Sequence, residues 1–389
     1  MMDYLTRDSV VNKMKNINIV ISSMDIGGAE KVLTTFLNNF DRRQYKVSLT
    51  LYRRKGSLLA DVPSDVEIRQ IVLNGEGYFA KMYRFFFRIL LMKFPKMLSQ
   101  IFRKKYSNNV VHIAFLEGLP TRIVSLMPGD RIAWVHTDII NNPASDKWFN
   151  SLEEEREIYG KFRQVVLVSQ SAKFAFETKL APTRVPINVL HNPIDSEFIQ
   201  KMALEKNRNF FEWNETTKNS KRLIVVGRIE KVKHVDLLIR AMAYIPKDIS
   251  LTIVGDGTEK ENLEKLCKNL HITNILFLGH IENPYPYLAN ADLYVNSSFV
   301  EAYPTAIAEA LVLGLPVLAS KNGGSEEILG DSEYGLIFPS NISAKNLADT
   351  LLSMLNQVDL WKQRANIGAR TLDIKKVMNQ YSTVIDNKE

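Results

Sequence analysis

Two glutamates eight residues apart, Glu301 and Glu309, are the side chains with the clearest chemical potential in this sequence. Pro304 between them suits the first turn of a helix, because its missing N–H would have no partner there anyway. Glu301 would then lie in the preceding loop, and Glu309 more than a turn inside the helix. An i,i+8 pair on one helix is ~12 Å apart along the axis, which is too far for an acid/base dyad. Two such carboxylates can instead hold hydroxyl groups at opposite ends of an elongated ligand.

Glu309 stands in an otherwise apolar run, AIAEALVLGLPVL. Burying a carboxylate is costly unless the group has a hydrogen-bonding partner. The run therefore favours a ligand-binding Glu309 over an ordinary exposed glutamate.

Two glycine-containing loops are candidates for binding phosphate. Gly227, Arg228 and Lys233 precede an apolar helical pattern, and two cations beside a helix start can neutralise a diphosphate. On charge alone, a solvated basic turn explains this loop equally well. Gly27 and Gly28 open an earlier helix, where backbone N–H groups and the helix dipole favour an anion. A tight turn is the commoner explanation of that pair, and neither loop matches GxGxxG or a Walker A motif.

Short β-branched runs alternate with helical patterns and predict an α/β protein with parallel sheets. The strand-like runs of the first half are Ile17–Ser23, Lys46–Tyr52, Val110–Leu116, Arg131–His136, Gln164–Ser169 and Ile187–Asn192. Those of the second half are Arg222–Arg228, Ser250–Gly257, Ile275–His280, Ala291–Ser298 and Leu315–Ser320. Ligands bind such sheets at the C-terminal ends of the strands, which is where the candidate residues lie.

The pattern of strands and helices restarts near Lys221, after a polar stretch at Asp195–Lys221 that we interpret as a linker. A chain of 389 residues suits two domains. We therefore expect two Rossmann-like, doubly wound domains facing across a cleft, the N-terminal one at residues 1–200 and the C-terminal one at residues 201–370. Residues 371–389 are expected to form a C-terminal helix that packs back toward the N-terminal domain.

The composition is that of an ordinary globular protein, with 46% apolar and 24% charged residues. The single cysteine, Cys267, excludes a disulfide framework and fits a reducing cytoplasm. Charged residues precede the first apolar stretch, so no signal peptide is expected. No uncharged apolar run approaches the ~20 residues that span a bilayer.

The net charge of +7 is unevenly placed, because the segment Lys81–Tyr106 contains eight Lys or Arg residues, no acid and many large apolar side chains. Such a segment can lie in a bilayer interface, with its cations near anionic lipid and its aromatic rings among the headgroups. A core-facing helix with a solvated basic rim is the alternative, and both interpretations stay open. Nucleic-acid binding is not expected, because no nucleic-acid module accompanies the segment.

From about Lys15 onward the chain resembles the retaining glycosyltransferases of family 4, which have the GT-B fold. Glu301 and Glu309 match the family's E-x7-E signature, Gly227, Arg228 and Lys233 match its phosphate site, and Gly27 and Gly28 match its N-terminal glycine loop. Further similar stretches, in order, are WVHTD around His136, LVSQSAK, HNPID, IVGDG and GGSEEI, the last of which contains Glu327.

The resemblance implies a nucleotide diphosphate sugar, taken to be a UDP sugar, as the donor substrate. It implies that Arg228 and Lys233 hold the diphosphate and stabilise the charge of the leaving group. Glu309 would accept hydrogen bonds from the ribose, Glu301 would face the donor sugar, and His136 would lie near the reacting carbon. Without the family, a buried histidine at a strand end would be the commoner interpretation of His136. Backbone N–H groups near sugar and phosphate would come from Ala302, Tyr303, Thr305 and Ala306.

Two departures from the family pattern affect the choice of sugar. Ala302 replaces the glycine that commonly follows the first glutamate, and His234 occupies a position that is usually small, asparagine or glycine. The Asp-x-Asp pair of metal-dependent GT-A enzymes is absent, and no His, Cys and acid cluster has metal-ligand spacing. We therefore expect transfer without a metal or a cofactor. Retention of configuration without an obvious nucleophile would imply front-face attack, a mechanism taken from the resemblance.

The expected function is a hexosyltransferase (EC 2.4.1.-) that moves a hexose or N-acetylhexosamine to a glycan or lipid-linked acceptor in bacterial surface polysaccharide synthesis, such as that of capsule or lipopolysaccharide. The expected location is cytoplasmic, peripheral on the inner face of the plasma membrane. Two alternatives stay open. One is a non-catalytic subunit that binds nucleotide sugars or carbohydrates, and the other is a GT-B nucleotide-sugar epimerase, which would need acid/base residues absent from this motif set.

Overall fold

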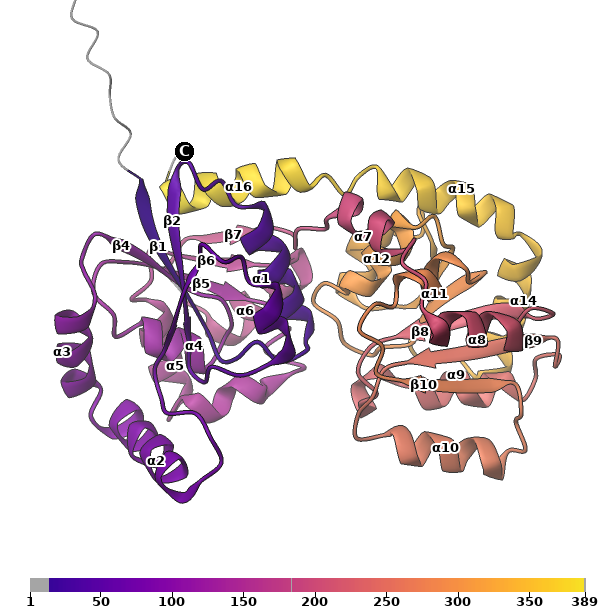
Figure 1. The fold of residues 1–389 in the computed structure, drawn as a ribbon, viewed down its shortest axis with the longest axis horizontal. Coiled ribbons are helices and arrows are strands. Elements are labelled where there is room, and N and C mark those ends of the chain that lie inside the picture. The colour runs from indigo at the N-terminus through magenta and orange to yellow at the C-terminus, as the bar shows by residue number, and fades with distance from the viewer. Residues whose placement is uncertain (1–13, 183, 388–389) are drawn as a thin grey trace, which may run out of the picture. The chain divides into compact units, whose positions relative to one another are not determined.

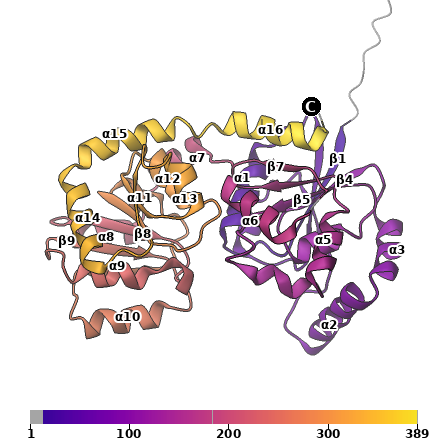
Figure 2. The same ribbon diagram turned by 180° about the vertical axis from the view of Figure 1, so that it is seen from behind.

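The apolar, β-branched runs of the chain form two separate sheets. A computed structural model describes residues 14–182 and 184–387 (Figures 1 and 2). The first sheet has seven strands in the order β3-β2-β1-β4-β5-β6-β7, and the second has six in the order β10-β9-β8-β11-β12-β13. The strands of the first sheet are β1 (Lys15–Ile21), β2 (Tyr45–Leu51), β3 (Glu67–Gln70), β4 (Val110–Ala114), β5 (Asp130–Val135), β6 (Gln164–Leu167) and β7 (Ile187–Val189). Those of the second are β8 (Lys221–Val226), β9 (Ile249–Val254), β10 (Ile275–Gly279), β11 (Leu293–Asn296), β12 (Val317–Ser320) and β13 (Leu336–Phe338).

Helices connect the strands. Those before β8 are α1 (Gly28–Asn39), α2 (Tyr78–Lys93), α3 (Pro95–Lys105), α4 (Leu119–Val124), α5 (Leu152–Tyr159), α6 (Gln170–Leu180), α7 (Ser196–Met202) and α8 (Arg208–Thr216). Those after β8 are α9 (Val235–Met242), α10 (Lys260–Asn269), α11 (Tyr285–Ala289), α12 (Thr305–Val312), α13 (Gly323–Leu329), α14 (Ala344–Asn356), α15 (Val358–Ala369) and α16 (Ile374–Asp386). Short 3-10 helices are η1 (Ser57–Asp61), η2 (Pro143–Trp148) and η3 (Lys231–Lys233).

Each sheet is doubly wound. In the second sheet the chain moves outward from β8 through β9 to β10, then returns to the other side of β8 and moves outward from β11 to β13. All five strand pairings of that sheet are parallel. Because crossovers between parallel strands are right-handed, the two directions place helices on opposite faces. Accordingly α9 packs with α10 and α14, whereas α12 packs with α7, α13 and α15.

The predicted fold class is therefore confirmed: two doubly wound parallel sheets with Rossmann-like connections. The strands agree with the predicted runs to within a few residues. Two edge strands, β3 and β13, were not predicted; they contain only four and three residues.

The stretch Asp195–Lys221, predicted as a linker, lies between the two sheets in sequence and contains the helices α7 and α8. In α8 the side chains of Phe210 and Trp213 are buried, and the indole Nε1 of Trp213 donates a hydrogen bond to Thr252 Oγ1 at 2.9 Å. The polar composition of the stretch hid this apolar pair at i,i+3 spacing, which places both side chains on one helix face.

Contacts divide the chain into two compact units. Among the described residues, 14–135, 145–166 and 184–186 form the first unit, and 136–144, 167–182 and 187–387 form the second. The predicted boundary at residue 200 separates the two sheets in sequence, since β7 ends before it and β8 begins after it. The assignment of domains to 1–200, 201–370 and 371–389 stays a prediction.

Candidate functional site

The two central strands of the second sheet, β8 and β11, deliver the candidate residues to one edge. They are neighbours in the sheet although β9 and β10 separate them in sequence, so the chain reverses its direction of winding between them. Parallel sheets bind ligands at such switch points, outside the C-terminal ends of the strands. The loop after β8 contains Arg228 and Lys233, and the loop after β11 contains Glu301. The topology therefore brings together side chains that are about 70 residues apart in sequence.

Lys233 and Glu301 form an ion pair across these two loops. Lys233 Nζ lies 2.5 Å from Glu301 Oε1, and the two side chains are 28% and 15% exposed. The pair is supported by backbone contacts, because Phe299 N–H donates to the Val232 carbonyl at 3.0 Å and Ser297 Oγ donates to the Lys233 carbonyl at 2.8 Å. The two loops therefore act as one structural piece.

His234 has a left-handed backbone conformation, with φ 50° and ψ 36°. Glycine, which has no Cβ, and asparagine adopt this conformation at the least cost. The backbone therefore accounts for the small residue, asparagine or glycine that the resemblance leads one to expect here, and His234 takes the position at some cost in strain. The imidazole packs on the ring of Phe299, with centroids 4.1 Å apart, and this contact offsets part of the strain.

The loop that carries Arg228 is held by a second glycine loop. A Cβ at Gly255 would lie 1.8 Å from the Gly227 carbonyl oxygen, and one at Gly257 would lie 2.3 Å from the Ile229 carbonyl oxygen. Only glycine fits at this close approach of two backbones. The Arg228 guanidinium is 62% exposed and contacts Glu230 at 3.2 Å, so it projects from a rigid base into solvent.

Glu309 is buried, as predicted, with 7% of its surface exposed. It lies on α12 beside the phenols of Tyr285 and Tyr294. Burial, followed by the charge and hydrogen bond of Glu309, raises the pKa of Tyr285 far above its usual value. Burial, followed by the charges of Glu301 and Glu309, raises the pKa of Tyr294 in the same way. Both glutamates thus belong to one polar cluster above the central strands.

Helix α12 begins at Thr305, a short loop after Glu301. Pro304 was predicted to lie in the first turn of this helix. In the structure it is the N-cap, just before that turn, because its ψ of 94° is extended. Thr305 and Ala306 form the first turn, where backbone N–H groups have no acceptor within the helix. The preceding residues, Ala302 and Tyr303, are buried. The predicted backbone donors therefore lie at a helix end that favours a negatively charged ligand.

A further helix, α13, supports the glutamate loop from beside it. Gly324 N–H donates to the Glu301 carbonyl at 3.2 Å, and a Cβ at Gly324 would lie 2.6 Å from that oxygen. The Asn322 side chain caps α13 through Ser325 N–H and donates to the Ser298 carbonyl at 3.0 Å. These contacts fix the backbone on which Glu301 stands.

Glu327 on the same helix joins three segments of the second unit. Its Oε1 lies 2.6 Å from His191 Nε2, and its Oε2 accepts a hydrogen bond from Gln170 N–H at 2.8 Å. The His191 ring stacks on Tyr303 at 5.1 Å, and the His191 carbonyl accepts a hydrogen bond from the Tyr381 hydroxyl at 2.8 Å. Glu327 therefore positions the residues around the site rather than projecting from it.

In the first unit, Gly27 is the N-cap of α1 and Gly28 is its first residue. A Cβ at Gly28 would meet no atom within 4 Å, whereas one at Gly27 would lie 2.2 Å from Glu30 Oε2. The Glu30 carboxylate thus lies at the helix N-terminus, where the dipole favours an anion. A phosphate that approached this loop would have to displace it.

His136 follows β5, and both of its ring nitrogens are buried. Burial lowers the pKa of His136 to about 3. At neutral pH the ring is uncharged, so it can donate one hydrogen bond and accept another but brings no positive charge to a ligand. Its predicted contact with the sugar stays a prediction.

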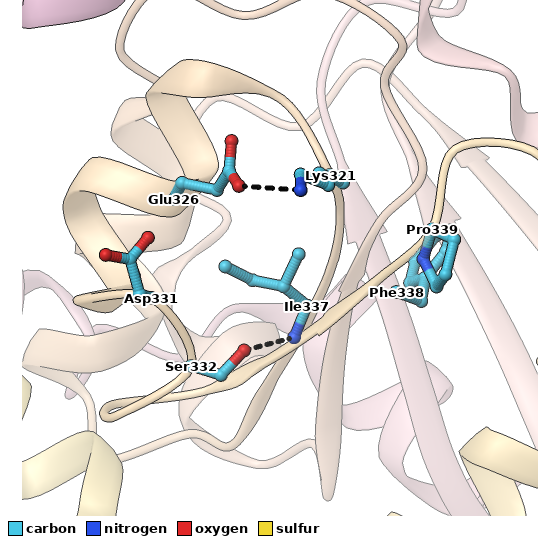
Figure 3. Close-up of a pocket in the computed structure, with 7 residues that line it drawn as sticks. All are labelled: Lys321, Glu326, Asp331, Ser332, Ile337, Phe338 and Pro339. Atoms are coloured by element: carbon cyan, nitrogen blue, oxygen red, sulfur yellow. Dashed lines mark hydrogen bonds and ion pairs between the residues drawn. The ribbon is translucent and has the colours of Figure 1, made fainter.

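Figure 3 shows a hollow at the end of β12 and β13 that none of the candidate residues line. Its volume is about 210 Å³, below the ~300–1,000 Å³ that is typical of ligand pockets. Lys321 and Glu326 form an ion pair across it at 3.5 Å. The hollow does not replace the β8–β11 edge as the candidate site.

Sequence reasoning missed the residues that hold the site: Ser297, Phe299, Gly255, Gly257, Asn322 and Gly324. The glycines among them lie in the stretches IVGDG and GGSEEI, which resemble the family but do not by themselves predict a supporting contact. Two glycine pairs after predicted strands are the signal that could have identified them, since glycine at a strand end often marks a close backbone approach. Within 14–182 and 184–387, no three His, Cys, Asp or Glu residues cluster as metal ligands would.

Comparison with known proteins gives matches over both halves of the chain. Residues 206–371 match the family described as "Glycosyl transferases group 1". An N-acetylgalactosaminyltransferase of Campylobacter jejuni that acts on a diphospho-undecaprenol-linked saccharide is 27% identical over 382 residues, which cover 94% of this chain and 97% of the relative. A second C. jejuni enzyme, an α-1,4-N-acetyl-D-galactosaminyltransferase for a PP-undecaprenol-linked saccharide, is 22% identical and covers 91% of this chain and 92% of its own length.

Solved structures match the fold at low sequence identity. The structure of Anabaena Alr3699/HepE in complex with UDP and glucose has a TM-score of 0.76 and 18% identity, and the match covers 96% of this chain and all of that one. WaaG, a glycosyltransferase involved in lipopolysaccharide biosynthesis, has a TM-score of 0.69 and 16% identity, with 95% and 99% covered. The chain thus has the fold of the GT-B glycosyltransferases, and its second half carries the sequence pattern of group 1 glycosyltransferases.

Proposed function

We propose that this protein is a retaining glycosyltransferase of family 4 that uses a nucleotide diphosphate sugar. The observation that carries the proposal is the Lys233–Glu301 pair at the switch point of the second sheet, with Arg228 exposed on the same loop as Lys233. All three residues lie within the matched residues 206–371. A cationic edge that adjoins a helix N-terminus suits a diphosphate, and a nearby carboxylate suits sugar hydroxyls.

Each candidate residue has a chemical role in this proposal. Arg228 and Lys233 bind the diphosphate and stabilise the negative charge that it gains as the bond to the sugar breaks. Glu309, held on a buried helix, accepts hydrogen bonds from the ribose, and Glu301 orients the sugar. His136 is uncharged, which suits a hydrogen bond to the sugar near its reacting carbon. The first-turn N–H groups of α12 add donors that need no side-chain rearrangement.

The acceptor that we propose is a glycan or a lipid-linked saccharide of a bacterial surface polysaccharide. Two relatives that span nearly the whole chain act on undecaprenol-linked diphosphosaccharides, which supports a prenyl diphosphate acceptor and an N-acetylhexosamine as the transferred sugar. The complex of Anabaena HepE with UDP and glucose supports UDP as the carrier nucleotide. We further propose that transfer needs no metal and takes place at the cytoplasmic side of the membrane.

The donor is tested by thermal unfolding with UDP, GDP, ADP and CMP sugars. A ligand at about 100 times its dissociation constant stabilises the folded state by ~2.7 kcal/mol, which shifts the midpoint by a few degrees at this domain size. We expect one nucleotide, UDP, to give the shift and the double variant Arg228→Ala/Lys233→Ala to lose it. Equal shifts in wild type and double variant would refute the diphosphate assignment.

Transfer is tested with UDP-N-acetylhexosamines or UDP-glucose and a short-chain prenyl diphosphate saccharide, with and without EDTA. We expect UDP release together with a longer saccharide, an unchanged rate in EDTA, and a product with the anomeric configuration of the donor. An inverted product would refute retention. Nucleotide binding without transfer to any saccharide would favour the non-catalytic binding subunit.

A further inference from the structure

Helix α2 is apolar on two sides, only one of which is covered. Ala80, Phe87 and Leu91 are buried against the first unit. Tyr78 and Phe85, by contrast, are 76% and 62% exposed. Phe85 and Phe87 are two residues apart, which places them about 200° apart around the helix. The exposed side chains are therefore not the edge of the core but a second apolar face.

These exposed side chains are aligned. Tyr78, Met82 and Phe85 follow i, i+4, i+7 spacing along α2 and are all exposed, so they form one stripe on its surface. Helix α3 repeats the arrangement, because Phe94, Met97 and Ile101 are 45–55% exposed while Leu98 and Phe102 are buried. Since α2 packs against α3, the two stripes lie on neighbouring helices.

The same region is strongly basic. Between Lys81 and Tyr106 there are eight Lys or Arg residues and no acid. Arg84 and Arg88 are used within the protein, since Arg84 donates to the Gly75 carbonyl at 2.7 Å and Arg88 lies over the Trp148 ring. In contrast, the exposed side chains Lys93, Lys96 and Lys104 have no ion-pair partner within the part of the chain that the structure describes.

We propose that this aromatic–basic face docks on an anionic lipid bilayer. We define the face by the exposed apolar residues Tyr78, Met82, Phe85, Phe94, Met97 and Ile101 together with Lys93, Lys96 and Lys104. Aromatic and aliphatic side chains insert at the boundary between headgroups and acyl chains. Each unpaired Lys or Arg near the surface raises the affinity for anionic lipid about fivefold. The proposal does not depend on the proposed function.

Other occupants fit the face less well. A second copy of the chain in a symmetric pair would bring the cations of two such faces together, and like charges repel each other at close range. Nucleic acid would use the cations, but its phosphate backbone offers no place for two stripes of large apolar side chains. A bilayer interface satisfies both features at once. The structure has no helix, within residues 14–182 and 184–387, that is long and apolar enough to cross a membrane.

The test is flotation of the full chain with vesicles of phosphatidylcholine alone or mixed with phosphatidylglycerol. We expect binding to the mixed vesicles to be at least tenfold stronger than to the neutral ones, and to weaken as salt is raised. Phe85→Ser/Phe94→Ser and Lys93→Gln/Lys104→Gln should each lower binding at least tenfold. The matched control is Phe174→Ser, which removes an aromatic ring that is 71% exposed on α6 and should leave binding unchanged.

Three outcomes would overturn the proposal. Wild type could fail to bind mixed vesicles, both double variants could bind as well as wild type, or Phe174→Ser could lose as much binding as Phe85→Ser/Phe94→Ser. A wild type that is dimeric by light scattering, with no vesicle binding and a monomeric Phe85→Ser/Phe94→Ser variant, would assign the face to a second copy instead. The nucleotide-dependent thermal shift is measured on every variant, so that failure of the donor assignment is seen separately.

Discussion

Replacement of Glu301 by Gln is expected to separate donor binding from transfer. Glu301 Oε1 lies 2.5 Å from Lys233 Nζ, and neither side chain is more than 28% exposed. Glutamine has almost the same size but no charge, so Nζ loses its ionic partner. A pair with this exposure lies between surface pairs, which contribute up to about 1 kcal/mol, and buried pairs, which cost about 3–5 kcal/mol to break.

A diphosphate that binds Lys233 must compete with Glu301 for the ammonium group. If the competition costs about 1–2 kcal/mol, its removal makes UDP binding about 5- to 30-fold tighter. Transfer should move in the opposite direction. Loss of a group that acts on the reacting sugar costs about 3 kcal/mol in the transition state, which is more than a 100-fold loss of rate.

Calorimetry with UDP and single-turnover transfer measure the two effects separately. Glu230→Gln is the matched control, because it removes the partner of Arg228 from an exposed pair at 3.2 Å and should change UDP affinity by less than about fivefold. If Glu301→Gln weakened UDP binding tenfold, the competition between carboxylate and diphosphate would be refuted. If it transferred sugar at the wild-type rate, Glu301 would have no role at the sugar.

Three other perturbations test separate parts of the structure. Gly324→Ala places a methyl group 2.6 Å from the Glu301 carbonyl oxygen, so kcat should fall about tenfold or more while UDP affinity changes little. The control is Gly77→Ala, whose methyl group would meet no atom within 4 Å and which should change neither kcat nor UDP affinity. Burial, then the charges of Arg131 and Arg69, lower the pKa of His112 to about 4. As pH falls, this histidine is protonated in the unfolded chain before it is protonated in the folded one. The free energy of unfolding should therefore fall by up to about 3 kcal/mol between pH about 6.5 and 4. Urea titrations of wild type and His112→Gln over this pH range measure the effect. Glu30→Gln should tighten UDP binding if the Gly27 loop contacts phosphate, as calorimetry would detect.

Each of these expectations has a contradicting result. If Gly324→Ala lowered kcat and UDP affinity equally, α13 would support the bound nucleotide and not the position of Glu301. An unchanged pH dependence in His112→Gln would mean that other groups cause the acid destabilisation. Unchanged UDP affinity in Glu30→Gln would leave the glycine loop of the first unit without a phosphate role.

The sheets could be predicted from the sequence because their signal is local. Buried parallel strands are continuous apolar runs, and β9 (ISLTIV) is buried at every position. The edge strand β3 (EIRQ) contains one apolar residue in four, so no run marks it. Helix α8 has only two buried side chains, and its polar surroundings made it look like a linker.

The burial of Glu309 could be predicted from residue types, but the contacts that support the candidate site could not. Glu309 was expected to be buried because it interrupts an apolar run, and it is 7% exposed. Nothing in the sequence indicates that Lys233 and Glu301 pair with each other, because their contact depends on the order β8-β11 in the sheet. The same holds for Gly324, whose neighbour is a carbonyl oxygen 23 residues earlier in the chain. Such contacts belong to the topology rather than to any local pattern.

Both loops for which the sequence predicts phosphate binding hold a carboxylate of the chain itself in the structure. Glu301 lies on Lys233, and Glu30 lies at the N-terminus of α1 beside Gly27. A carboxylate neutralises a cation or a helix dipole and so stabilises the conformation of the loop. It offers fewer acceptor oxygens and less negative charge than a diphosphate. A nucleotide diphosphate can therefore displace it at a modest cost in affinity. The return of the same carboxylate would in turn assist the release of the nucleotide product, which limits the rate of many enzymes. On this argument Glu301→Gln should slow UDP dissociation as well as tighten binding, because the competing anion has been removed.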